Sequence, residues 1–167
     1  DLEYFIKKIL SLGHLSTIEH VSFTFGIEGI SRSLLAQITR HRIASFSVKS
    51  QRYVAERKKP GETFNYIIPS SIKELGQEYE VKFSQQMEQM QDWYNEWFEL
   101  LDGREGGAGE DARFVLPNAA ETKMVMTMNA RELYHFFRLR CCNRAQWEIR
   151  ELAWQMLDLV KRVAPSI

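Results

Sequence analysis

The sequence has few of the features that mark secreted, membrane-spanning or disulfide-stabilised proteins. Its 167 residues include only two cysteines, Cys141 and Cys142, which are adjacent. Neighbouring cysteines are a poor arrangement for a structural disulfide and lack the spacing of metal ligands. No apolar run reaches the length of a membrane span, and no signal peptide opens the chain. We therefore expect a cytoplasmic protein in a reducing compartment, with no membrane partner.

The chain also has no excess of either charge, because 22 basic residues balance 22 acidic ones. A balanced chain is a poor general polyanion binder, so we expect no nucleic-acid partner. The charges are nevertheless sorted along the chain. Residues 32–59 are strongly basic, whereas residues 74–105 are mainly acidic. This sorting favours a local anion pocket over a broad basic surface.

The four histidines show no spacing typical of a metal site. His14, His20, His41 and His135 form no His-x3-His pair and no pairing with a cysteine. We expect no metal ligand among them.

Hydrophobic periodicity predicts a single α+β domain, with mixed helices and antiparallel strands, over residues 1–167. Alternation predicts strands at 21–27, 64–68 and 121–129, the first broken at Gly29. Ser31 is expected to cap the second helix, and Ser16 to Glu19 has the form of a capping box. The apolar spacing predicts helices at 1–12, 31–40, 72–101, 110–116, 129–139 and 143–163. Because the sequence begins already inside a helix, we expect its natural N-terminus to be missing.

The predicted helix over 72–101 carries a stripe of methionine and aromatic side chains. Such a stripe is far more typical of core or subunit contacts than of a cofactor site. Trp93 and Trp97 fall on neighbouring faces of this helix, which gives a small domain more apolar surface than a monomer buries and predicts an oligomer. Trp147 and Trp154, on the last helix, are predicted to be core.

The most informative stretch is residues 40–53, RHRIASFSVKSQRY. Its cations are mostly arginines, whose planar fork suits bidentate pairing with phosphate. Ser45, Ser47 and Ser50 add small hydrogen-bond donors, and serine-rich turns leave backbone N–H groups free to bind anions. The stretch therefore predicts a site for a phosphorylated ligand. The alternative is a basic loop that binds nothing.

Arg40-His41-Arg42, followed after seven residues by Ser50, resembles the RHR-x7-S signature of the flavin-dependent thymidylate synthases. The similarity extends over nearly the whole chain in the family's order. It includes His14 with Ser16, Phe23–Phe25, Gln37, Ile43–Phe46, Ala112–Pro117, Asn129–Arg131, and Leu139–Arg140 with Ala145–Ile149.

The resemblance implies a homotetramer whose active sites are shared between subunits. Its members use FAD, reduced by NADPH, to transfer a methylene group from 5,10-methylenetetrahydrofolate to dUMP. They then reduce that group to the methyl of dTMP. The implied partners of this chain are therefore dUMP, a folate and further copies of itself.

The resemblance also assigns roles to residues. Arg140 is implied to be catalytic, since a guanidinium stays protonated and can stabilise a uracil ring that loses its imide proton. The implied cofactor-binding residues are Ser16, Arg40, His41, Arg42, Asn129, Ala130, Arg131 and His135. The implied substrate-binding residues are Gln37, Ile38, Thr39, Arg40, Val48, Lys49, Ser50, Gln51, Arg52, Arg113 and Arg140.

Three positions depart from the family pattern. Val48 stands where many members have a carboxylate or amide, so only a backbone contact is expected there. His135 and Arg144 stand where asparagine and histidine are common. The family's opening strand is also absent, so the resemblance implies that an N-terminal strand is missing from this sequence.

Two other functions compete with this one. The first is a non-enzymatic RNA- or nucleotide-binding module that uses Phe46 and Tyr53 as stacking platforms. The second is a different flavoprotein on the same scaffold. Under the leading hypothesis no side chain attacks the pyrimidine, because Ser50, Cys141 and Cys142 have no partnering base at a recognisable spacing.

Overall fold

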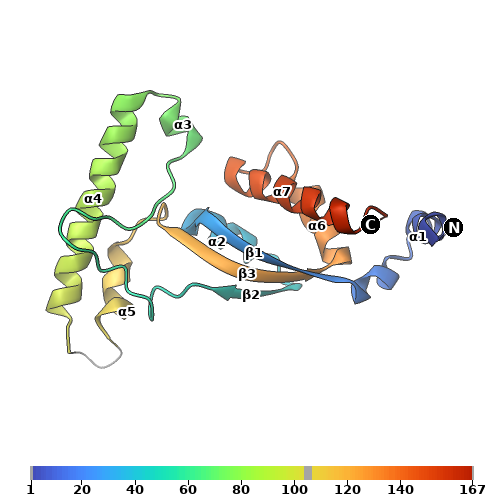
Figure 1. Ribbon diagram of the computed structural model, residues 1–167, viewed down its shortest axis with the longest axis horizontal. Coiled ribbons are helices and arrows are strands. Elements are labelled where there is room, and N and C mark those ends of the chain that lie inside the picture. The colour runs from blue at the N-terminus through green and yellow to red at the C-terminus, as the bar shows by residue number, and fades with distance from the viewer. Residues whose placement is uncertain (1, 104–106, 167) are drawn as a thin grey trace. The chain divides into compact units, whose positions relative to one another are not determined.

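The computed structural model describes residues 2–103 and 107–166, which form helices and a three-stranded sheet (Figure 1). The predicted α+β class is confirmed. Contacts group the chain into two compact units. The terminal unit comprises residues up to Ile27, Ala36–Ser47 and the chain from Met124, and the central unit comprises Glu28–Leu35 and Val48–Lys123. A single domain over 1–167 stays a prediction.

The sheet has the strand order β1-β3-β2, with β1 at Ser22–Ser31, β3 at Glu121–Asn129 and β2 at Ala44–Val48. The two ends of the β1–β3 pair fix an antiparallel register. At one end Arg32 N donates to Ala120 O, and at the other Ala130 N donates to Val21 O. Strand β2 lies within the basic stretch and was not predicted.

Strand β1 is longer than its sequence pattern predicts. Phe25 and Ile27 are buried on one face, as expected, but the strand continues through Gly29 to Ser31. The next buried residue is Ile30, three positions after Ile27, so the alternation shifts by one residue. Gly29 allows this shift because its φ of 70° lies in the left-handed region, which favours glycine and is typical of a β-bulge.

Strand β3 has the predicted bounds and the predicted alternation. Thr122 and Met124 are buried with the two following alternate methionines, while Lys123 and Val125 are exposed. The strand leads directly into α6 (Ala130–Arg140), because the Asn129 side chain accepts a hydrogen bond from Glu132 N and caps the helix.

The terminal unit also contains α1 (Leu2–Ser11), the 3-10 helix η1 (Leu15–His20) and α7 (Trp147–Val163), and α6 packs against both η1 and α7. The last helix starts later than predicted, because Gln146 caps it by accepting from the backbone N–H groups of Glu148 and Ile149. Trp154 is 49% exposed, so its assignment to the core was wrong. The capping box predicted from Ser16 was also wrong, since η1 follows His14 without a side-chain cap.

Helix α2 (Arg32–Ile38) begins as predicted after Ser31, whose hydroxyl accepts from Leu34 N at 3.0 Å. It ends two residues before the predicted Arg40.

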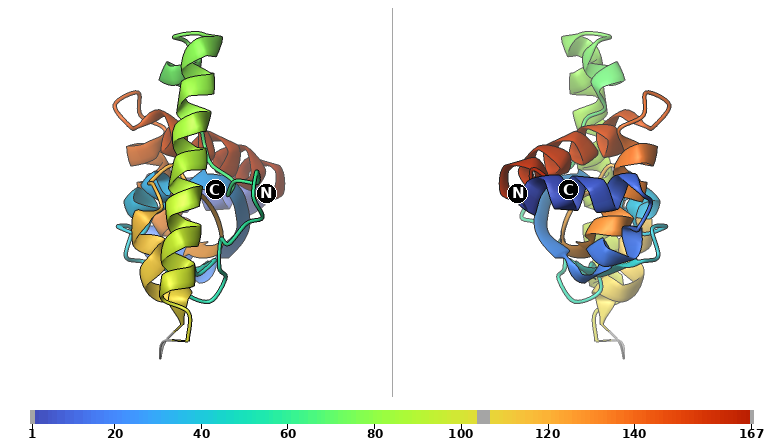
Figure 2. Two further views of the ribbon diagram at one scale, coloured as in Figure 1. Left: turned by 90° about the vertical axis from the view of Figure 1, so that its left-hand side faces the viewer. Right: turned by 90° about the vertical axis from the view of Figure 1, so that its right-hand side faces the viewer.

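The central unit is built on α4 (Gln77–Leu100), preceded by α3 (Ser70–Lys73) and followed by α5 (Ala108–Ala112) and the 3-10 helix η2 (Arg113–Val115). Gly76, with a φ of 113°, separates α3 from α4, so the predicted helix over 72–101 is two helices. Figures 1 and 2 show α5 beside the C-terminal half of α4. The predicted strand over 64–68 is reduced to one bridge between Tyr66 and Ala120.

No helix among the described residues is long and apolar enough to cross a membrane.

Polar side chains of α4 hold the segment that follows the basic stretch. Gln91 is 1% exposed; its Oε1 accepts from Phe64 N at 2.8 Å and its Nε2 donates to Glu56 O at 3.0 Å. One helical turn later Asn95 bonds the backbone of Lys58 at both N and O. Tyr94 Oη accepts from Glu56 N at 3.1 Å. Helix α4, whose apolar stripe was predicted to be core, therefore also binds the backbone of residues 56–64 through its polar side chains.

We expect Gln91→Leu to lower the free energy of unfolding by about 1–3 kcal/mol, because it leaves a buried N–H and a buried carbonyl without a partner. Urea unfolding followed by circular dichroism measures the loss. Gln89→Leu, at an exposed position of the same helix, is the matched control and should change stability by less than about 0.5 kcal/mol. Equal effects of the two substitutions would contradict the anchoring role.

Candidate functional site

His41 is the one residue of the arginine–histidine–arginine motif whose side chain is buried. It follows the end of α2, and its backbone N donates to Ile38 O at 3.0 Å. Its ring is 6% exposed and lies edge-on to Phe136, with ring centroids 5.0 Å apart. Its Nδ1 is 3.2 Å from Glu132 Oε1, and its Nε2 accepts from Arg140 Nε at 3.0 Å. Helix α6 therefore holds the imidazole from both sides.

The hydrogen bonds fix the protonation of His41. Because the guanidinium of Arg140 can only donate, His41 Nε2 must offer a lone pair, and the ring proton must be on Nδ1, where it donates to Glu132. Burial lowers the pKa of His41, the charges of Arg140 and His135 lower it further, and Glu132 opposes them by raising it. At neutral pH His41 is therefore a neutral imidazole between a carboxylate and a cation.

His41, Glu132 and His135 also bring three potential metal ligands within 4.8 Å of one another, although two of them are 94 positions apart in the sequence. Each histidine metal ligand must offer a free ring lone pair. In His41 the Nε2 lone pair accepts from Arg140, and Nδ1 carries the proton that Glu132 binds. Both nitrogens of His41 are therefore engaged by hydrogen bonds, whereas His135 contacts the His41 ring edge-on, with ring centroids 6.1 Å apart.

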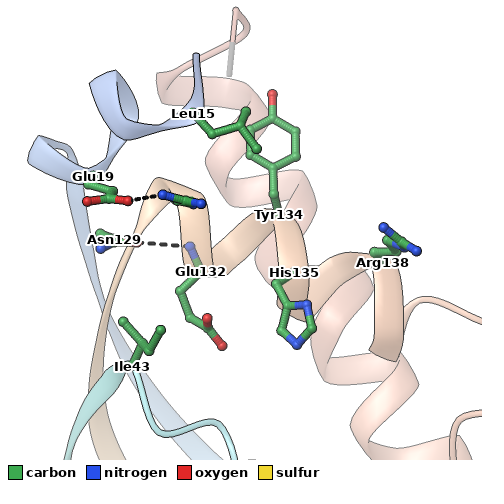
Figure 3. Close-up of a pocket in the computed structure, with 9 residues that line it drawn as sticks. Leu15, Glu19, Ile43, Asn129, Glu132, Tyr134, His135 and Arg138 are labelled. Atoms are coloured by element: carbon green, nitrogen blue, oxygen red, sulfur yellow. Dashed lines mark hydrogen bonds and ion pairs between the residues drawn. The ribbon is translucent and has the colours of Figure 1, made fainter. Parts of the chain in front are cut away.

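A cavity of about 880 Å³ opens beside this network in the terminal unit (Figure 3). It lies along α6 and includes the capping Asn129, and an ion pair joins Glu19 to Arg131 at its edge. The N-terminus of α6 adds partial positive charge here. The residues that line the cavity are Leu15, Glu19, Ile43, Asn129, Arg131, Glu132, Tyr134, His135 and Arg138.

The structure brings several of the predicted cofactor residues together. Asn129, Arg131 and His135 line the cavity, and Ala130 is buried next to them. Arg40 and Arg42 are exposed in the loop before the lining residue Ile43, and within the described ranges neither forms an ion pair. Ser16 is exposed on η1 between two lining residues but does not line the cavity itself.

Six lining residues were not among the predicted site residues: Leu15, Glu19, Ile43, Glu132, Tyr134 and Arg138. A signal for two of them was present, because Arg131, Tyr134, His135 and Arg138 recur at the three- and four-residue spacing of one helix face.

The predicted substrate residues of the terminal unit lie at the end of α2. Gln37 Nε2 is 3.5 Å from Gln146 Oε1, which is a weak contact. Thr39 is exposed, whereas Ile38 is fully buried, so Ile38 could offer a ligand only its backbone. Arg140, predicted to be catalytic, is half-buried and held at Nε by His41.

The central unit contains the other predicted substrate residues. Ser50 Oγ accepts from Arg52 N at 3.2 Å, which shapes a tight turn. Arg52 Nε is 3.0 Å from Glu110 Oε2, and Arg113 Nε donates to Glu110 O at 2.9 Å. Gly109 lets the backbone approach, since a Cβ atom there would lie 3.3 Å from Arg52 O. Glu110, which the sequence did not single out, thus links Arg52 and Arg113.

The start of the same segment is fixed by its backbone. Lys49 N donates to Lys123 O at 2.9 Å, and Lys49 Nζ forms an ion pair with the buried Glu56. Arg32, also missed, donates to Lys49 O at 3.0 Å, while its buried Nε has no partner among the described residues. Burial and the charge of Arg113 lower the pKa of Arg32. Val48 and Gln51 are half-buried in this segment.

Both cysteines are free, as the sequence predicts. Burial raises the pKa of Cys141, whereas hydrogen bonds and charge from Arg144 lower the pKa of Cys142.

Comparisons with known proteins identify the family of this chain. A family profile described as "Thymidylate synthase complementing protein" matches residues 1–166. A flavin-dependent thymidylate synthase of Geobacter sulfurreducens is 56% identical over 167 residues, covering 100% of this chain and 68% of the relative. Proteins of the same name from Nitratidesulfovibrio vulgaris and Sulfolobus acidocaldarius are 53% and 47% identical. The match with the Nitratidesulfovibrio vulgaris protein covers 98% of this chain and 65% of the relative. The match with the Sulfolobus acidocaldarius protein covers 100% of this chain and 60% of the relative. The chain thus spans about two thirds of these relatives.

Proposed function

This chain belongs to the thymidylate synthase complementing protein family, and from that premise we propose that it is an FAD-dependent thymidylate synthase. In this proposal it transfers the methylene group of 5,10-methylenetetrahydrofolate to dUMP and reduces it to the methyl group of dTMP, with NADPH as reductant. The family resemblance carried by the RHR-x7-S signature is confirmed. The observation that carries the proposal is the cavity on α6, with the Glu132–His41–Arg140 network beside it.

The cavity suits a flavin nucleotide in size and in chemistry. Its volume of about 880 Å³ falls within the range of ligand pockets. The N-terminus of α6, with Arg131 and Arg138 on the helix, would attract the pyrophosphate. Asn129 and His135 add hydrogen-bonding groups, and Arg40 and Arg42 add cations from the preceding loop. When bound, FAD would supply the redox chemistry that protein side chains lack.

We assign the phosphate of dUMP to Ser50, Arg52 and Arg113. An arginine fork pairs with phosphate through two parallel hydrogen bonds, and the turn at Ser50 holds Arg52 in place. Glu110 occupies one side of Arg52, so the phosphate would use the remaining guanidinium edge or displace that carboxylate. In the terminal unit, Arg140 would contact the uracil ring, and Gln37 and Thr39 would also bind dUMP. In the central unit, the backbone of Val48 to Gln51 would bind the same ligand.

Arg140 is suited to stabilise negative charge that develops on the uracil ring. Its guanidinium stays protonated, so its charge does not depend on a proton transfer. The hydrogen bond from Nε to His41 leaves the two terminal nitrogens free for substrate. In this role the protein holds and neutralises the ring while the nucleophile is the pyrimidine carbon itself.

The protein should bind FAD and form dTMP. We expect a bound-flavin visible spectrum after FAD addition, bleaching by NADPH without oxygen, and dTMP formation when dUMP and methylenetetrahydrofolate are supplied. Absorbance spectroscopy and chromatography of the nucleotides measure these outcomes. A protein that binds nucleotides but no flavin would be a binding module instead, and one that binds flavin but not dUMP would be a different flavoprotein.

Arg140→Ala should impair turnover far more than flavin binding. Loss of a charge-assisted contact to a buried anionic ring costs about 2–5 kcal/mol of transition-state stabilisation, or about 30-fold and more in rate. Arg140→Lys should rescue only part of the rate, because an ammonium lacks the fork. Stopped-flow kinetics with flavin titration of each variant separates the two effects. Normal turnover in Arg140→Ala would remove this residue from the mechanism.

We also propose a cytoplasmic homotetramer with active sites shared between subunits. The support is an exposed aromatic surface on α4, where Trp93 is 46% and Trp97 48% exposed. Light scattering at micromolar concentration should give the mass of four chains. If the sites are shared, a mixture of the Arg52→Ala and Arg140→Ala variants should regain part of the activity that each lacks. A monomer at that concentration would refute the assembly.

A further inference from the structure

We propose that Glu132 is a positioning residue that fixes the tautomer of His41 and, through it, the orientation of the Arg140 guanidinium. The proposal rests on the proposed function for the role of Arg140 in turnover. Glu132 itself belongs neither to the RHR-x7-S signature nor to the Asn129–Arg131 motif. Its assignment comes from the chain of hydrogen bonds that runs from one end of α6 to the other.

Glu132 is held rigidly. Its backbone N donates to the capping Asn129 Oδ1 at 2.9 Å, so its place in the first turn of α6 is fixed by the helix cap. Its side chain is 8% exposed and its Oε1 lies 3.2 Å from His41 Nδ1. Figure 3 shows the Glu132 side chain extending from the start of α6 into the space between Ile43 and His135. A buried carboxylate in a fixed place is a strong hydrogen-bond acceptor.

The direction of each hydrogen bond is set by this acceptor. A neutral imidazole can carry its proton on either nitrogen, and only the Nδ1–H form leaves Nε2 free to accept from Arg140. Glu132 can only accept when ionised, so it favours the same Nδ1–H form that the Arg140 donor requires. Without Glu132, His41 could also adopt the Nε2–H form, in which its Nε2–H group would face the Nε–H donor of Arg140. The guanidinium would then lose the contact that fixes its angle.

The charged groups that face His41 are Glu132, His135 and Arg140, all on α6, and Arg40 and Arg42 flank it in the loop. If His41 becomes protonated, Nε2 also becomes a donor and faces the Arg140 cation. Protonation therefore has the same consequence for Arg140 as the wrong tautomer. Because the carboxylate of Glu132 raises the pKa of His41, its removal should lower that pKa.

Two variants of Glu132 in the FAD-loaded protein separate positioning from simple packing. Glu132→Gln keeps an oxygen that can accept from Nδ1–H, so we expect kcat within about threefold of wild type at pH 8. Glu132→Ala removes the acceptor, and kcat should fall about 10-fold or more with little change in the Kd for FAD. Glu151→Gln, an exposed carboxylate on α7, is the control and should leave kcat unchanged.

The pH profile gives a readout that a packing role would not move. The acid limb of kcat that reports His41 protonation should shift to lower pH in Glu132→Gln, since the charge that favoured the imidazolium is gone. ¹⁵N NMR of histidine-labelled protein, with His41 assigned from its loss in His41→Gln, should show the Nδ1–H form in wild type and Glu132→Gln. In Glu132→Ala it should show a mixture of tautomers.

Several results would overturn the proposal. One is a wild-type kcat in Glu132→Ala, and another is an unshifted acid limb in Glu132→Gln. A third is an Nε2–H tautomer in the wild-type protein. If Glu132→Ala does not fold, the pH profile and NMR spectrum of Glu132→Gln decide. The NMR measurement needs no turnover, so a protein with the expected tautomer that makes no dTMP would refute the proposed function and leave the positioning role of Glu132 intact.

Discussion

The buried imidazole of His41 is the constraint on which the terminal unit depends. A ring that is 6% exposed must find partners for both nitrogens, and helix α6 supplies them at its first and last turns. The two hydrogen bonds of His41 attach the arginine-rich loop to α6. They also give the three motif residues different exposures to solvent. His41 is turned inward, while Arg40 and Arg42 stay in solvent. The motif thus contains one structural anchor and two cations that are free to meet an anion.

Helix α6 connects strand geometry to site chemistry. Strand β3 ends at Asn129, whose side chain caps the helix, so the position of the sheet determines where the first turn of α6 begins. From that start, helical spacing places Arg131, His135 and Arg138 along one cavity. The opposite face buries Leu133 and Phe136. The sequence of β3 and α6 therefore supplies six of the nine residues that line the cavity, together with part of the core.

Local patterns were enough to predict β3 and the α2 cap at Ser31, because each rests on spacing within about ten residues. The lining residues Asn129, Arg131 and His135 were expected only from the family resemblance. Other features depend on long-range contacts. Glu132 and His41 are 91 positions apart, and no local pattern marks the buried carboxylate as a partner. Gln91 is a polar residue beside an apolar stripe, and the sequence does not show that it binds the backbone of Glu56 and Phe64. Strand β2 was not predicted because its serines are typical of a loop. It is a strand because it pairs with β3.

The charges of the central unit suit a phosphate monoester better than its formal composition suggests. Arg52 and Arg113 both contact Glu110, and the charge of Arg113 acts on Arg32. Three arginines against one glutamate leave two positive charges, which is about the opposite of a phosphate monoester near neutral pH, at roughly −1.5 to −2. The nearby Lys49 adds nothing to this sum, since Glu56 already neutralises it. In the proposed site, Glu110 would therefore hold Arg52 and Arg113 in place without cancelling the positive charge that attracts the phosphate.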